Sequence, residues 1–97
     1  MALLVKKTKF KNTEVEVSNL YVRLQYFAFA DGKKVSVKLI TALNKDDALS
    51  YKELATNLPE SLALTLSDEQ EQNLATIHEL VKAKLEESGF EVTIDLK

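Results

Sequence analysis

The side chains that could do chemistry are few in this chain, and their spacing matches no catalytic motif. There is no cysteine and a single histidine, His78, which leaves no thiolate nucleophile and no sulfur ligand for zinc. Nucleophilic catalysis needs a base beside a nucleophile, and no serine or threonine has a spacing that would bring it to His78. We therefore interpret His78 as a residue at the edge of a helix, and we expect no enzyme activity.

Two pairs of adjacent carboxylates are the other candidates for a chemical site. Asp46 and Asp47 could hold a cation, but neither an EF-hand spacing nor a second cluster of oxygen ligands accompanies them, and they are typical of a turn or a helix cap. Glu86 and Glu87 point in different directions if they lie on a helix, so they form no acid–base pair. The sequence thus predicts no metal, no cofactor and no small-molecule substrate.

Length and composition indicate one soluble globular domain spanning residues 1–97. The chain is 45% hydrophobic and 29% charged, which is the balance of an ordinary folded domain. Its first residues are apolar and then basic, the reverse of an export signal. No apolar run approaches the roughly 20 residues that cross a membrane. We expect a cytoplasmic protein with no membrane partner.

The dipeptide Asp31-Gly32 lies between two β-rich runs and is typical of a two-residue hairpin turn. The register that this turn sets makes one face of the hairpin mostly apolar, with the pairs Ala28–Val35, Tyr26–Val37, Leu24–Leu39, Val22–Thr41 and Leu20–Leu43. The other face is mixed, with the pairs Phe29–Lys34, Phe27–Ser36, Gln25–Lys38, Arg23–Ile40 and Tyr21–Ala42. A slip by one residue would scramble this separation, so the register is well specified.

Shorter strands are predicted around the hairpin. Residues 2–10 and 14–17 precede it, residues 62–66 form a brief extended segment, and residues 90–96 alternate in the manner of a half-buried strand. Residues 48–58 have a spacing compatible with a short helix, and we leave open whether they form a helix or a loop.

A long C-terminal helix is predicted over residues 68–88. Ser67 and Gln70 have the spacing of a capping box, and Gly89 is typical of a helix end. The apolar stripe of this helix is Leu74, Ile77, Val81 and Leu85. At 1.5 Å per residue the helix would be about 31 Å long, enough to span a sheet. The sequence therefore predicts an α+β fold: an antiparallel sheet built on a long hairpin, one long helix on one of its faces, and a final strand.

Charge is divided unevenly along the chain. Residues 1–45 hold nine basic and three acidic side chains, whereas residues 46–97 hold four basic and twelve acidic ones. In one interpretation an acidic helix neutralises a basic sheet within the molecule. In another, the basic face of one copy meets the acidic face of the next. In the third, the sheet binds nucleic acid, and the candidate contacts are Lys6, Lys7, Lys9, Lys11, Lys33, Lys34 and Lys38.

Three aromatic residues project from one side of the predicted hairpin: Tyr21, Phe27 and Phe29. They form either a second core face, covered by another part of the chain, or a protein interface with Arg23 at its rim. In the nucleic-acid interpretation the same rings would stack on bases.

Parts of the first fifty residues resemble small structural proteins encoded near the tail genes of bacteriophages and prophages. The resemblance rests on the opening Met1-Ala2-Leu3 with a lysine-rich strand, on Leu20-Tyr21-Val22-Arg23-Leu24, and on Asn44-Lys45-Asp46-Asp47-Ala48. It implies a virion-associated subunit that works through repeated protein contacts. The function we predict is a non-enzymatic phage-type structural or assembly protein that binds itself, forming a homo-oligomer, or docks on other virion proteins. The alternative is a nucleic-acid-binding accessory protein that uses the basic N-terminal sheet.

Overall fold

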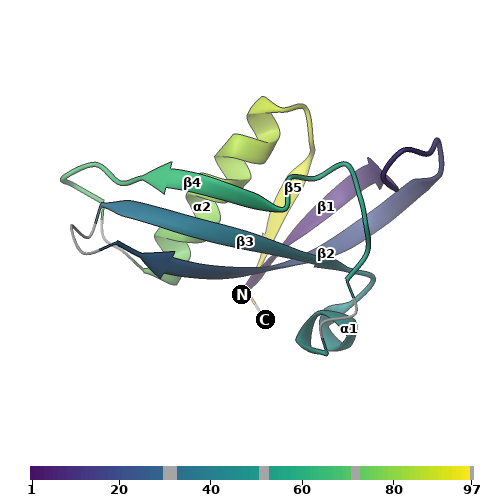
Figure 1. Ribbon diagram of the computed structural model, residues 1–97, viewed down its shortest axis with the longest axis horizontal. Coiled ribbons are helices and arrows are strands. Elements are labelled where there is room, and N and C mark those ends of the chain that lie inside the picture. The colour runs from purple at the N-terminus through teal and green to yellow at the C-terminus, as the bar shows by residue number, and fades with distance from the viewer. Residues whose placement is uncertain (30–32, 51–52, 71–72, 97) are drawn as a thin grey trace.

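Over residues 1–29, 33–50, 53–70 and 73–96, which the computed structural model describes, five strands form one antiparallel sheet and two helices lie against it (Figure 1). In chain order the elements are β1 (Ala2–Lys9), β2 (Glu16–Ala28), β3 (Lys34–Ala42), α1 (Lys45–Leu49), β4 (Ser61–Thr65), α2 (Leu74–Glu87) and β5 (Val92–Asp95). The strand order is β4-β3-β2-β1-β5, with every pair antiparallel. This confirms the predicted α+β class, the antiparallel sheet and the final strand.

The hairpin of β2 and β3 has the register that the sequence predicts. The confirmed pairs include Ala28–Val35, Tyr26–Val37, Leu24–Leu39 and Val22–Thr41. The ladder ends at Tyr21–Ala42, so the fifth expected pair, Leu20–Leu43, does not form, and Leu43 is exposed before α1. The predicted turn at Asp31-Gly32 lies outside the described residues. Alternation of apolar and polar side chains sets this register, because one face of the hairpin is buried.

β2 joins two segments that the sequence predicts as separate strands, residues 14–17 and the first strand of the hairpin. Asn19, between them, has a φ of 54°, in the left-handed region that asparagine tolerates better than most residues. Val17 and Leu20 both pack in the main core although they are three residues apart. The pairing with β1 keeps the same register on both sides of this point, although Lys6 and Asn19 themselves are not paired.

α2 is shorter than predicted, and the expectation of a long C-terminal helix is wrong. It has 14 residues, about 21 Å at 1.5 Å per residue. Ser67 and Gln70 do meet, since Gln70 Oε1 accepts the Ser67 N–H at 2.8 Å, but this contact closes a turn. The helix begins after Asn73, whose Oδ1 accepts the Thr76 N–H at 2.9 Å.

The late start of α2 follows from where its apolar side chains begin. Residues 68–73 are all polar, so a helix there would bury no apolar face, and burial of such a face is what holds most helices in proteins. The end of α2 is as predicted. Gly89 has a φ of 95°, its N–H donates to Glu86 O at 3.0 Å, and the Phe90 N–H donates to Leu85 O at 3.1 Å. This is the Schellman arrangement, which turns the chain towards β5.

The two helices cover opposite faces of the sheet. α2 covers the face of the main core, to which it contributes Ile77, Val81 and Leu85, and it approaches β5 and β1 most closely. α1 covers part of the other face and contributes Ala48 to a smaller cluster. No helix among the described residues is long and apolar enough to cross a membrane.

Of the segment 48–58, left open between helix and loop, residues 48 and 49 belong to α1, whereas residues 53–58 are not helical and continue to residue 60 as a loop. They run beside the end of β3, where the Leu54 N–H donates to Thr41 O at 2.8 Å and Thr41 Oγ1 donates to Leu54 O at 2.6 Å. They then reach the end of β1, where the Asn57 N–H donates to Lys9 O at 3.0 Å. The segment thus ties together two strands that are not neighbours in the sheet.

Candidate protein-interaction surface

One face of β2 carries the four residues that the sequence singles out for protein contact. Tyr21, Arg23 and Phe27 alternate along the strand, and Phe29 follows it, with its N–H donating to Lys34 O at 2.9 Å. The structure divides this set. Tyr21 is only 8% exposed and Arg23 is half-buried, whereas Phe27 and Phe29 are 71% and 56% exposed. The core interpretation therefore holds for Tyr21, and only Phe27 and Phe29 remain as candidates for a partner.

Tyr21 is buried because α1 packs over it. Asn44 caps this helix, with its Oδ1 accepting the Asp47 N–H at 2.9 Å, and Asp46 and Asp47 occupy the first turn, where carboxylates are favourable. The acidic pair thus lies in the first turn of a helix, and the cap itself is Asn44. Ala48 is fully buried in one cluster with Tyr21, and its small side chain lets α1 lie close to the sheet.

The charges near the Tyr21 hydroxyl oppose each other. Burial raises the pKa of this hydroxyl, the carboxylate of Asp95 raises it further, and the guanidinium of Arg23 lowers it. Tyr21 is protonated at neutral pH already at its ordinary pKa of 10.0, and the raised pKa widens that range. Tyr21, Arg23 and Asp95 thus lie where the part of the sheet face that α1 covers ends and the uncovered part begins.

α1 does not cover the rest of this face. The described residues of β2, β3 and β4 whose side chains lie there are all exposed or half-buried. The register places Ser36 of β3 beside Phe27, and Ala63 of β4 beside Ser36. These small side chains leave the ring of Phe27 standing above a flat surface. We call this surface the open half-face, and its residues are Gln25, Phe27, Phe29, Lys34, Ser36, Lys38, Ser61, Ala63 and Thr65.

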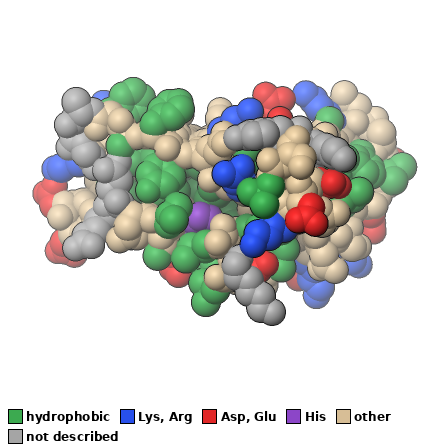
Figure 2. Space-filling view, turned by 90° about the horizontal axis from the view of Figure 1, so that it is seen from below, with side chains coloured by type: hydrophobic (Ala, Val, Ile, Leu, Met, Phe, Trp, Pro, Cys, Tyr) green, Lys and Arg blue, Asp and Glu red, His purple; other side chains and the backbone are tan. Residues whose placement is uncertain are grey.

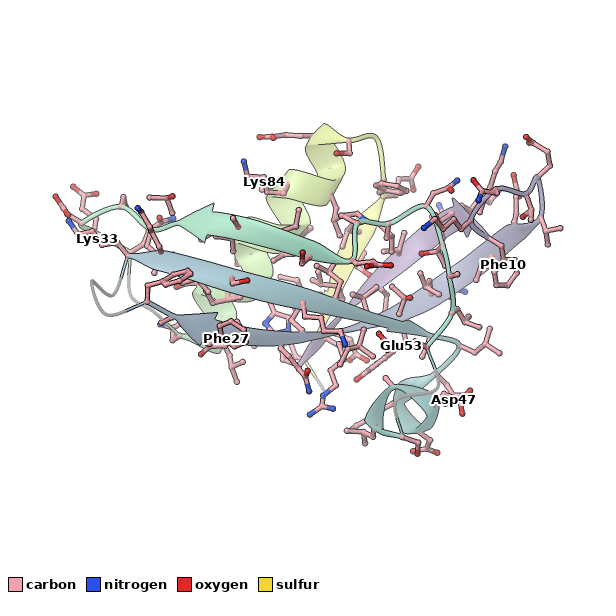
Figure 3. The ribbon with its side chains drawn as sticks, in the orientation of Figure 1. Phe10, Phe27, Lys33, Asp47, Glu53 and Lys84 are labelled. Atoms are coloured by element: carbon pink, nitrogen blue, oxygen red, sulfur yellow. The ribbon has the colours of Figure 1, made fainter. Side chains whose placement is uncertain are left out.

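The figures show how this surface lies in the molecule. In Figure 3, Phe27 lies on the part of β2 towards Lys33, away from α1 and its Asp47. Figure 2, seen from below, shows hydrophobic side chains left of centre around the purple histidine and others at the right end. Exposed large apolar side chains therefore occur in several parts of the molecule: besides Phe27 and Phe29 they include Val15 in the turn before β2 and Leu43 before α1.

The seven candidate lysines do not form one continuous patch. Lys33, Lys34 and Lys38 lie on or next to β3, whereas Lys6, Lys7, Lys9 and Lys11 lie on β1 and in the turn that follows it. Figure 3 places Lys33 at one end of the molecule and Phe10, the neighbour of Lys9 and Lys11, at the other. Nucleic acid would meet two separated groups of cations.

Four of these lysines have carboxylate partners. Lys6 Nζ lies 3.4 Å from Glu91, Lys9 Nζ 2.7 Å from Glu14, and Lys38 Nζ 3.9 Å from Glu53, while Lys33 contacts Asp68. The hydrogen bond from Lys9 raises the lysine's pKa and lowers that of Glu14. This arrangement favours the interpretation in which acidic groups of the same molecule neutralise its basic sheet.

His78 is buried rather than at a helix edge, so that expectation is wrong. Its side chain is 1% exposed, because the apolar face of α2 is wider than its central stripe. Nδ1 lies 2.7 Å from Leu74 O, and no described residue provides a hydrogen-bond partner for Nε2. Burial lowers the pKa of the imidazole. A neutral, enclosed imidazole of this kind fills space and has no nucleophile to activate among the described residues.

A hollow of about 770 Å³ lies between the loop of residues 53–60, the end of β3 and the turn after β1. Its wall includes the ion pair of Lys38 with Glu53. No group of three or more His, Asp or Glu side chains that could hold a metal ion occurs among the described residues. The lining of the hollow mixes polar side chains, such as Lys11 and Glu53, with apolar ones, such as Leu54 and Leu58.

Comparison of the chain with protein-family models, with curated proteins and with solved structures finds no match.

Proposed function

We propose that this chain is a non-enzymatic assembly protein that binds a second copy of itself or docks on a larger protein assembly through the open half-face. The observation that carries the proposal is the exposure of Phe27 and Phe29 on a face of which α1 covers only the Tyr21 half. A phage-type setting belongs to the same proposal and is supported by the resemblance of the first fifty residues.

The physical reason is the free energy of burying the two rings. A phenylalanine side chain that moves from water into an interface contributes about 1.5–3 kcal/mol, and aromatic residues at the centre of an interface carry much of its affinity. Ser36 and Ala63 beside Phe27 are small, so a partner can approach the sheet closely. Lys34 and Lys38 lie at the border, as is usual for the polar rim of an interface.

The test is sedimentation equilibrium of the double variant Phe27→Ser, Phe29→Ser beside the wild type. We expect the dissociation constant for self-association to rise at least about tenfold, which corresponds to about 1.4 kcal/mol. Val15→Ser is the matched control, because Val15 is 58% exposed on the turn between β1 and β2, away from the open half-face. All three proteins should keep the same circular dichroism.

Equal dissociation constants for the wild type and the double variant would contradict the proposal. So would retention on DNA or RNA that falls steeply with salt, because counterion release is the signature of phosphate binding. That second result would favour the nucleic-acid alternative.

A further inference from the structure

The open half-face ends at β4, which is an edge strand of the sheet. Two hydrogen bonds fix which of its backbone groups face β3: Leu39 N–H donates to Glu60 O at 2.9 Å, and Leu66 N–H donates to Lys33 O at 2.7 Å. In an antiparallel ladder, alternate residues direct both backbone groups to the neighbouring strand and the residues between direct them away. The residues of β4 that direct theirs away from β3 are Ser61, Ala63 and Thr65.

Nothing in the described part of the chain covers these outward groups. All three residues are exposed, and no backbone hydrogen bond from another described residue reaches them. Residues 61–66 contain no charge, no proline and no glycine. Natural sheets normally protect an edge with charged side chains, proline or a bulge, and here Pro59 and Glu60 come before the exposed stretch instead of within it. The edge is therefore ready to accept another strand.

We propose that β4 of one copy pairs antiparallel with β4 of a second copy, about a two-fold axis at Ala63. This inference goes beyond the proposed function, because edge pairing is a separate contact between copies that leaves Phe27 and Phe29 exposed. The occupant is a second copy because the edge is complementary to itself. With the axis at Ala63, that residue pairs with its own copy, and Ser61 pairs with Thr65 of the second copy. Every outward residue then enters a hydrogen-bonded pair that exchanges both N–H···O bonds.

The fold leaves room for this pairing. A two-fold axis perpendicular to the sheet puts both copies of α2 on the same face, but α2 approaches β5 and β1, at the far side from β4. α1 contacts β2 and β3 at the end where Tyr21 lies. Neither helix makes its main contacts with β4, and we expect the backbones of the two copies to reach the normal strand spacing of about 4.8 Å.

Charges across the proposed contact are compatible. The residues that pair directly, 61–65, carry no charge. Glu60 comes opposite Leu66 of the second copy, and Lys33, whose backbone accepts from Leu66, has its own charge balanced by Asp68 within the same copy. On the face of the sheet away from α2, Phe27, Ser36 and Ala63 lie side by side on β2, β3 and β4. In the proposed pair this row of side chains continues through Ala63 and Ser36 to Phe27 of the second copy. The two open half-faces become one surface, with the Phe27 residues about 24 Å apart at 4.8 Å per strand.

The test is Ala63→Pro, which removes the outward N–H at the axis and leaves the β3 ladder intact. Proline is tolerated on an edge strand where its nitrogen faces solvent. Ala63→Val, which keeps the N–H, is the matched control. We expect Ala63→Pro to sediment as a 10.9 kDa monomer at concentrations where the wild type and Ala63→Val are dimers. Thr65→Lys, a charge on an exposed edge position, should also dissociate the dimer and does not depend on the fold accepting a proline.

The outcomes separate this inference from the proposed function. If Ala63→Pro and Thr65→Lys dimerise as the wild type does while Phe27→Ser, Phe29→Ser does not, edge pairing is overturned and self-association through the open half-face stands. If the wild type is a monomer at every concentration, self-association and edge pairing are both overturned.

Discussion

His78 shows how burial decides what a titratable side chain can do. Nδ1 donates to Leu74 O at 2.7 Å, so in the neutral ring Nε2 is an acceptor, and it has no partner among the described residues. Protonation would place a second N–H and a positive charge in this enclosed site. Burial is the main cause of the lowered pKa, and the positive N-terminus adds to it, while the interactions with the backbone of Leu74 and of Met1 act in the opposite direction.

The lowered pKa of His78 predicts a loss of stability in mild acid. Above the ordinary pKa of 6.5 the folded and unfolded chains are both neutral at this residue, and His78 gives no pH dependence. As the pH falls below 6.5, the unfolded chain binds a proton that the folded chain resists, so the free energy of unfolding decreases until the pH reaches the lowered pKa of the folded state.

The measurement is urea unfolding at pH 7.5 and at pH 5 for the wild type and for His78→Leu. Carboxylates contribute equally to both proteins, so the difference between them isolates the imidazole. We expect the wild type to lose more stability than His78→Leu between these two values. The same loss in both proteins would show that His78 is not responsible.

Elements differ in how far local sequence decides them. The register of β2 and β3 could be predicted because alternation over many residues agrees with a turn dipeptide. The start of α2 could not, because Ser67 and Gln70 satisfy each other equally well in an isolated turn. What decides the start is the first apolar side chain available to the core, and that side chain comes after Asn73.

This account of α2 predicts which cap matters. Asn73→Ala removes the acceptor for the Thr76 N–H and should lower the free energy of unfolding by about 1 kcal/mol. Ser67→Ala is the matched control, since it leaves the Ser67 N–H bonded to Gln70, and it should change stability by no more than about 0.5 kcal/mol. Urea unfolding measures both, and a larger loss for Ser67→Ala would place the functional cap at Ser67.

The candidate site was only partly predictable, for a similar reason. The strand register put Tyr21, Phe27 and Phe29 on one face, and the structure confirms this for the described ladder. The sequence did not show which of these rings α1 covers. The docking position of this helix of five residues depends on tertiary contacts. The sequence contains one indication of the exposed edge, the uncharged residues 61–66. The strand order is needed to show that these residues lie at the edge of the sheet.

The distribution of charge over the molecule bears on how copies would meet. Three ion pairs join residues 1–45 to residues 46–97: Lys6–Glu91, Lys33–Asp68 and Lys38–Glu53. Such exposed pairs contribute little to stability, but they set the opposite charges of the chain beside each other within one copy. A contact through Phe27 and Phe29 would be apolar and one along the edge of β4 would be backbone-bonded, so either should resist salt.

The mass of the wild type in solution tests self-association most directly. It can be measured by light scattering behind a sizing column, over about a hundredfold range of protein concentration and at low and high salt. We expect the mass to rise from 10.9 kDa towards twice that value with concentration, and the dimer to persist at high salt. A mass of 10.9 kDa under every condition would contradict self-association, and a dimer that dissociates in salt would contradict the apolar contact in favour of a charge-mediated one.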